Sequence, residues 1–181
     1  MITTKRFALS GPSGSGKTTI MNKLNVPVHK MFSCTREAIP LEKEFFINGM
    51  QDYIILRSVV VANMDHSLIV DRCVLDAYVY TKLIANGDNP MFLQLNNAHK
   101  ALQYLKNFEH IFLFEPLDNV VDDNIRWTDT AKNQKVYDEM LNILKKSEIQ
   151  YTIIDKKMSI KSRIKLIEGV INESIGSESN L

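Results

Sequence analysis

The sequence contains little cysteine, which excludes two classes of small cross-linked domain. Only Cys34 and Cys73 occur in 181 residues, too few for a disulfide framework and too far apart for a zinc site. A chain of this length buries an adequate core without such cross-links. We therefore expect one globular domain whose thiols stay reduced, as they do in cytoplasmic proteins.

The sequence has little excess charge of either sign and no long apolar run. The 22 basic residues nearly balance 21 acidic ones, and the net charge of +1 gives no overall attraction to nucleic acid or to anionic membranes. The most apolar stretch, Tyr53 to Ala62, is interrupted by Arg57 and is too short to span a bilayer. The first residues lack the apolar core of a secretory signal. These features predict a cytoplasmic protein without a membrane partner.

Apolar runs bounded by turns alternate with helical patterns. This alternation is typical of an α/β fold whose parallel sheet is covered on both faces. The strand candidates are Phe7–Ser10, Val28–Ser33, Ser67–Asp71, His110–Phe114 and Tyr151–Ile154. Helices are expected at Lys17–Leu24, Leu41–Phe46, Asp52–Met64, Val74–Ala85, Met91–Lys106, Thr130–Lys145 and Ile160–Ser174. Residues 1–175 would form a single domain and residues 176–181 a flexible tail.

The first expected strand leads into a glycine-rich loop, GPSGSGKT at residues 11–18, and this loop leads into a helix. The loop satisfies the GxxxxGK[ST] pattern of a phosphate-binding loop (P-loop) in the required strand–loop–helix context. Glycines let backbone N–H groups approach phosphate oxygens, the lysine adds charge near the outer phosphates, and the threonine ligates Mg²⁺. We therefore expect ATP and Mg²⁺ as cofactors, with Thr18 as a metal ligand. The expected nucleotide-binding residues are Gly11, Ser13, Gly14, Ser15, Gly16, Lys17, Thr18 and Thr19.

Residues that follow each strand are the next candidates, because ligands of an open parallel sheet bind beyond the carboxyl ends of its strands. Asp71 and Arg72 stand at the end of the segment SLIVDRC. The aspartate is a candidate metal ligand or base, and the arginine could neutralise a transferred phosphoryl group. The alternative is a capping aspartate followed by a solvated arginine. Asp76 and Tyr78, on the next helix, are candidates for binding an acceptor, although Tyr78 fits the core equally well.

Arg36 and Glu37 follow the second expected strand. Facing the P-loop, they could bind the phosphate or hydroxyl of an acceptor and remove its proton. The alternative is a surface ion pair. Gln51, at the start of a helix, could hydrogen-bond a base or sugar of the acceptor, although a glutamine in this position is usually only solvated.

The segment at residues 117–136 combines high polarity with a poor helical pattern, and it carries Arg126 beside the only tryptophan. A loop of such length in a compact domain is usually functional or disordered. We expect a lid that closes over ATP and brings Arg126 to the transition state. The alternative is an ordinary polar connection.

One dense basic run lies near the C-terminal end, at Lys156, Lys157, Lys161, Arg163 and Lys165. Three of its lysines recur every four residues opposite isoleucines, which indicates the wet face of an amphipathic helix. Nucleic acid is therefore possible as an acceptor but not favoured, because its binding would need a basic surface wider than one helix face.

Taken together, these segments resemble the nucleoside and nucleotide kinase group of P-loop proteins. The resemblance is closest to the AAA-type ATPase/kinase domain of nicotinamide-riboside kinases, and the TRE and DR segments are also similar to thymidylate kinase. It rests on GPSGSGKT, on TRE at 35–37, on DR at 71–72 followed by DAY at 76–78, and on DDNIR at 122–126. This resemblance implies a three-layer fold with a five-stranded parallel sheet of order 2-3-1-4-5, helices on both faces and a small lid.

The resemblance also implies roles for individual residues. Lys17 would bind the phosphates of ATP, Arg36 and Arg72 would contact the acceptor or the transferred phosphate, and Arg126 would act from the lid. Either Glu37 or Asp71 would take the proton of the acceptor hydroxyl, and Asp71 would also help to hold Mg²⁺.

We therefore expect an ATP-dependent kinase that transfers the γ-phosphoryl group to a hydroxyl or phosphate of a nucleoside-like or nucleotide-like small molecule. One alternative is a phage-type kinase that acts on a hydroxymethylated pyrimidine base in DNA. Another, from a different class, is an ATP-binding regulatory switch. The sequence does not identify the acceptor. It also leaves the oligomeric state open, and a homodimer is compatible with it.

Overall fold

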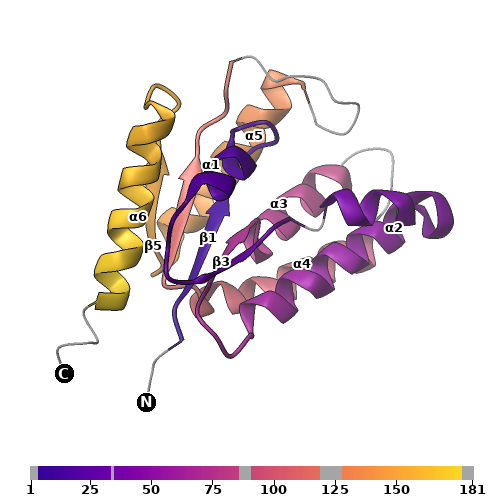
Figure 1. Cartoon of the computed structure of the whole chain (residues 1–181). Helices are drawn as coiled ribbons and strands as arrows, with labels where there is room; N and C mark the ends of the chain where they lie inside the picture. Colours follow the sequence, from indigo (N-terminus) through magenta and orange to yellow (C-terminus); the bar gives the residue numbers. More distant parts are fainter. Residues whose placement is uncertain (1–3, 34, 86–90, 119–127, 177–181) are drawn as a thin grey trace.

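The computed structural model describes residues 4–33, 35–85, 91–118 and 128–176, and for residues 35–48 it describes the backbone alone. Five parallel strands form one sheet in the order β2-β3-β1-β4-β5, which confirms the predicted order (Figure 1). The strands are β1 (Arg6–Ser10), β2 (His29–Met31), β3 (Leu68–Asp71), β4 (His110–Phe114) and β5 (Gln150–Ile154).

Helices connect successive strands and cover both faces of the sheet. They are α1 (Lys17–Lys23), α2 (Thr35–Ala62), α3 (Val74–Ala85), α4 (Phe92–Ala101), α5 (Thr130–Lys146) and α6 (Ile160–Gly176), with a 3₁₀ helix η1 (Leu102–Asn107) after α4. Figure 1 shows α6 and the pair α3 and α4 on opposite sides of the sheet. No helix in the described part of the chain is both long and apolar enough to cross a membrane.

The core is divided in two by the sheet, because successive side chains of a strand point to opposite faces. On the central strand β1, Ala8 packs into the cluster under α2, α3 and α5, whereas Phe7 and Leu9 pack into the cluster under α1 and α6. The strand β1 is therefore buried on both faces, as central parallel strands usually are. Each fully buried large side chain, such as Phe7, contributes roughly 1.5–3 kcal/mol.

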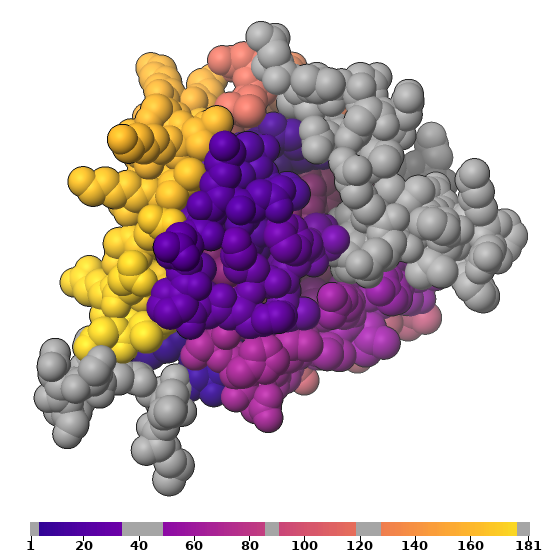
Figure 2. Space-filling view, viewed as in Figure 1, coloured from indigo at the N-terminus to yellow at the C-terminus, as the bar shows by residue number. Residues whose placement is uncertain are grey.

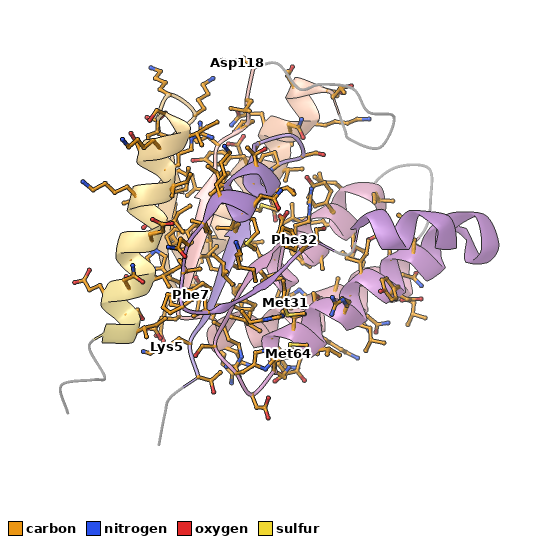
Figure 3. The ribbon with its side chains drawn as sticks, in the orientation of Figure 1. Lys5, Phe7, Met31, Phe32, Met64 and Asp118 are labelled. Atoms are coloured by element: carbon orange, nitrogen blue, oxygen red, sulfur yellow. The ribbon has the colours of Figure 1, made fainter. Side chains whose placement is uncertain are left out.

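The register of β1 determines which strand ends meet. Leu9 of β1 pairs with Asp71 at the end of β3, and Ser10 pairs with Leu113 of β4. The loop after β1 therefore begins beside the last residue of β3. Figure 3 shows Asp118, which follows β4, at this carboxyl end of the sheet, and Lys5 and Met64, which precede strands, at the other end.

Two of the predicted helices are in fact one. The predictions Leu41–Phe46 and Asp52–Met64 leave a gap at residues 47–51, which contains an Asn-Gly pair, yet α2 runs through this gap from Thr35 to Ala62. A glycine inside a helix costs only about 1 kcal/mol. Burial of Ile55, Val61 and Ala62 in the core outweighs that local preference. The segment TRE therefore forms the first turn of a helix and not a strand-end loop.

Candidate functional site

The loop between β1 and α1 has the backbone of a P-loop, as predicted. Three of its glycines have left-handed φ values, 140° at Gly11, 73° at Gly14 and 89° at Gly16. Only glycine adopts such angles without strain. Gly11 also passes close to β4, since a Cβ atom there would lie 2.7 Å from the carbonyl oxygen of Phe114. Figure 2 shows this N-terminal part of the chain at the surface beside α6.

Lys17 lies in the first turn of α1 with its ammonium group over the loop. Its side chain is 4% exposed, and Nζ donates to the carbonyl oxygens of Gly11 at 2.8 Å and Pro12 at 2.6 Å and to Oγ of Ser15 at 2.9 Å. These contacts hold a positive charge against the loop and use all three N–H groups of the ammonium. A phosphate group bound by Lys17 would replace at least one of these acceptors.

Thr18, in the first turn of α1, contacts Asp71, the last residue of β3. The Thr18 hydroxyl donates to Oδ2 of Asp71 at 2.7 Å, and Asp71 is 2% exposed. Its second oxygen, Oδ1, is buried and accepts no hydrogen bond from any residue that the structure describes. A hydroxyl next to a carboxylate with a spare oxygen is a donor set that suits Mg²⁺, so the residues fit the predicted metal.

Arg72 follows β3 with a left-handed backbone, φ 75°, which is uncommon for a residue with a side chain. Its N–H donates to the carbonyl of Leu9 at 2.9 Å, and its guanidinium lies 4.8 Å from the centre of the Tyr80 ring. Burial works against the guanidinium charge, but Tyr80 and two nearby carboxylates outweigh this effect and raise the pKa of Arg72 above its ordinary value. The arginine therefore stays charged at the edge of the P-loop.

Asp76 joins α3 to the start of the P-loop. Its Oδ2 accepts from Oγ of Ser10 at 2.7 Å and from the N–H of Cys73 at 3.1 Å, and its Oδ1 lies 3.4 Å from the N–H of Gly11. Oδ1 also lies 3.7 Å from Nη1 of Arg72. Asp76, which was predicted to bind an acceptor, is 2% exposed, and its carboxylate accepts hydrogen bonds from its own chain.

Tyr78 and Gln51 do not join this cluster in the part of the chain that is described. Two residues along a helix turn the side chain to nearly the opposite side, so Tyr78 points away from Asp76. The Tyr78 ring lies 5.8 Å from the His99 ring of α4 and packs against the core. Gln51 is buried between α2 and α3, where its Oε1 lies 3.2 Å from the Thr81 hydroxyl.

The remaining predicted residues are placed less fully. Arg36 and Glu37 lie in the first turn of α2, but their side chains are outside the described part of the structure. Arg126 also lies outside the described residues. From Thr130 onwards, the predicted lid belongs to α5, which Asp129 caps by accepting from the N–H groups of Ala131 and Lys132. The roles of Arg36, Glu37 and Arg126 therefore stay predictions.

Two residues near the site were not predicted from the sequence as site residues. Tyr80 lies one turn after Asp76 on the same side of α3, and burial raises the pKa of its phenol while Arg72 opposes the rise. Arg163 belongs to the basic run, yet it is 6% exposed. A signal for Arg163 was available, because it stands four residues before Ile167 and eight before Ile171, the buried residues of α6. That spacing places it on the apolar side of the helix.

A family model described as AAA domain matches residues 34–163 of the chain. The chain belongs to the AAA domain family. The matched part of the chain begins after the P-loop and includes Asp71, Asp76 and Arg163. No curated protein matches the chain.

Solved structures similar to this AAA domain chain include deoxyadenosine kinase from M. mycoides in three liganded forms. The form with bound dCTP has a TM-score of 0.63 at 17% identity, covering 93% of this chain and 99% of that one. The form with the products dCMP and a flexible dCDP has a TM-score of 0.63 at 15% identity, with 93% and 98% covered. The form with dATP has a TM-score of 0.59 at 16% identity, with 92% and 99% covered. This likeness shows that the chain has a nucleoside kinase fold.

Proposed function

We propose that this protein is an ATP-dependent kinase that transfers the γ-phosphoryl group to a nucleoside or nucleotide acceptor. The contact between Thr18 and Asp71 carries the proposal, because it joins the P-loop helix to a strand-end carboxylate that has a free oxygen. A P-loop alone would be consistent with any kind of nucleotide-binding protein. The added carboxylate and Arg72 supply what phosphoryl transfer needs, which is metal placement and charge neutralisation.

Mg²⁺ would be held by the Thr18 hydroxyl and by Asp71, directly or through water. When bound with ATP, the ion neutralises the charge that develops on the phosphate oxygens. Lys17 orients the outer phosphates with its ammonium group, and the loop N–H groups hold the inner ones. Arg72 lies at the same edge of the sheet, where its permanent charge would face the group in transfer.

The acceptor is proposed as a deoxynucleoside or its monophosphate. The similar structures contain dCMP, dCDP, dCTP and dATP, which supports an acceptor of this chemical class. Arg36 and Glu37 are proposed to bind it, and either Glu37 or Asp71 to take its proton. Arg126 is proposed to act from a lid. Nicotinamide riboside and a hydroxymethylated base in DNA are the other acceptors to be tested.

Turnover of ATP with a panel of acceptors tests the proposal. The panel holds deoxynucleosides, their monophosphates, nicotinamide riboside and DNA containing hydroxymethyl-pyrimidines, each incubated with labelled ATP and Mg²⁺. We expect labelled product from a deoxynucleoside or monophosphate, and its loss in Lys17→Ala and Arg72→Ala variants that remain folded by circular dichroism. If label appeared only in DNA, the acceptor would be a base in DNA and not a free nucleoside or nucleotide. ATP hydrolysis at the same rate without any acceptor would overturn the kinase in favour of a regulatory switch.

A further inference from the structure

Two side chains of α3 approach the guanidinium of Arg72. Asp76 and Tyr80 follow Arg72 at intervals of four residues, a spacing that brings side chains to the same side of a helix. Nη1 of Arg72 lies 3.7 Å from Oδ1 of Asp76, and its Cζ atom lies 4.8 Å from the centre of the Tyr80 ring. The arginine thus has an anionic and an aromatic neighbour on the same helix.

The Asp76 carboxylate attracts the guanidinium but does not orient it. The distance of 3.7 Å exceeds that of a hydrogen bond, which for nitrogen and oxygen is about 2.7–3.2 Å. The same carboxylate accepts hydrogen bonds from the Ser10 hydroxyl and the N–H of Cys73. Groups other than the arginine therefore determine how this carboxylate is placed.

Tyr80 has the geometry that fixes the plane of a guanidinium. A cation over an aromatic ring is attracted within about 6 Å of the ring centre, and a planar guanidinium can also stack on the ring. The buried hydroxyl of Tyr80 interacts with the same guanidinium and with the N–H of Ser13 in the P-loop. One side chain thus contacts both the arginine and the P-loop.

The backbone of Arg72 is held separately from its side chain. Its N–H donates to the carbonyl of Leu9 at 2.9 Å, and its φ of 75° is the left-handed value noted above. A strained backbone of this kind persists where the surrounding structure determines it. The main chain of Arg72 is therefore fixed to β1, and the orientation of the far end of the side chain depends on its contacts with α3.

We propose that Tyr80 is a positioning residue that orients the Arg72 guanidinium beside the P-loop for phosphoryl transfer. The inference rests on the proposed function, which assigns Arg72 to the transferred phosphoryl group. An arginine side chain has several rotatable bonds, and its charge favours the transition state only where its N–H groups meet the phosphoryl oxygens. Without the ring, the guanidinium would keep its charge and lose its orientation.

NMR relaxation of arginine side chains tests the inference without substrate. We expect the order parameter of the Arg72 Nε–H bond to be roughly 0.85 in wild type and in Tyr80→Phe, which keeps the ring, and below about 0.6 in Tyr80→Leu. Tyr104→Leu is the matched control and should behave as wild type, because Tyr104 is another half-buried tyrosine packed against the same core cluster. An equally rigid Nε–H bond in Tyr80→Leu would overturn the inference.

Turnover of the same variants tests the consequence for catalysis. In Tyr80→Leu, kcat should fall roughly 10- to 100-fold through misplacement of Arg72, while KM for ATP changes less than about threefold. Tyr80→Phe should restore kcat to within about threefold of wild type, and Tyr104→Leu should match it. A loss confined to KM would overturn the inference by making Tyr80 part of the donor site. A wild-type protein without kinase activity would overturn the proposed function, and the NMR result would still decide whether Tyr80 orients Arg72.

Discussion

The hydroxyl of Thr18 lies 2.7 Å from Oδ2 of Asp71, a residue 53 positions further along the chain. The contact leaves Oδ1 of the same carboxylate buried and without a hydrogen bond from the described residues. A buried polar atom left unpaired typically costs about 1–3 kcal/mol. A cation bound at this position would recover that free energy, so we expect Mg²⁺ binding to raise the stability of the protein.

Replacing Asp71 with asparagine should lower activity with little effect on stability. The amide is nearly the same size and carries no charge, so we expect the free energy of unfolding without ligand to stay within about 1 kcal/mol of wild type. Turnover should fall by about 100-fold or more, as it does when a group that stabilises transition-state charge is removed. Thermal denaturation with ATP, in the presence and absence of Mg²⁺, is the measurement. A Mg²⁺-dependent rise in Tm equal to that of wild type would contradict the metal role.

Asp76 should matter far more for stability than Asp71. Alanine at this position removes the acceptor of Ser10 and Cys73 and leaves the Arg72 charge without its neighbour. Losing one member of a buried pair lowers the free energy of unfolding by about 3–5 kcal/mol. Urea denaturation followed by circular dichroism measures this.

The matched control for Asp76→Ala is Asp65→Ala, since the Asp65 side chain is fully exposed. A change within about 0.5 kcal/mol is expected there. Similar losses in both variants would show that Asp76 does not fix the start of the P-loop.

Alanine substitutions at two P-loop glycines should differ in severity. At Gly11 the new Cβ would lie 2.7 Å from a main-chain oxygen of Phe114, so the loop and β4 would have to separate. At Gly16 the nearest atom is 3.7 Å away, and the penalty is the left-handed backbone alone, about 1–2 kcal/mol. We expect Gly11→Ala to lower Tm more than Gly16→Ala in parallel thermal scans. The reverse order would contradict the close approach of the loop to β4.

Cys73 should be unreactive while the protein is folded. Burial, followed by the nearby Asp76 carboxylate, raises the pKa of its thiol to about 12, whereas an ordinary thiol ionises near pH 9. In a Cys34→Ser background, a thiol-specific disulfide reagent at pH 8 should label Cys73 only at the rate of unfolding. Rapid labelling of the native protein would contradict the buried, protonated state.

The same shift predicts a dependence of stability on pH. Between about pH 9 and pH 12 the folded state keeps the Cys73 proton that the unfolded state releases, so stability falls as the pH rises through this window. A Cys73→Ala variant should show a shallower fall between pH 9 and 11 in urea denaturation. Parallel curves for the two proteins would argue against the raised pKa.

The sequence was sufficient for the three central strands, β1, β3 and β4, because they are buried on both faces and appear as short apolar runs. β4 was predicted residue for residue, and so was α3. The long helix α2 was not, since a local Asn-Gly signal competes there with tertiary burial that no single sequence displays.

Within the site, the pattern GPSGSGKT was sufficient to predict the conformation of the loop, because the glycine positions require left-handed backbone. The positions of Asp76 and Tyr78 depend on how α3 is rotated about its axis. The spacing of the two residues already separates them by about half a turn, but it does not say which one faces the loop. Nη1 of Arg163 lies 3.7 Å from where a Cβ atom of Gly16 would be, and only the assembled fold brings these distant residues so near to each other.

The position of β1 at the centre of the sheet has a consequence for synthesis of the chain. β1 leaves the ribosome first, but its two partners end at residues 71 and 114. Until both have emerged, an apolar strand is exposed with two unpaired edges, which favours aggregation. The nascent chain should therefore depend on chaperones until β4 has emerged, and truncated products that end before β4 should accumulate as insoluble material.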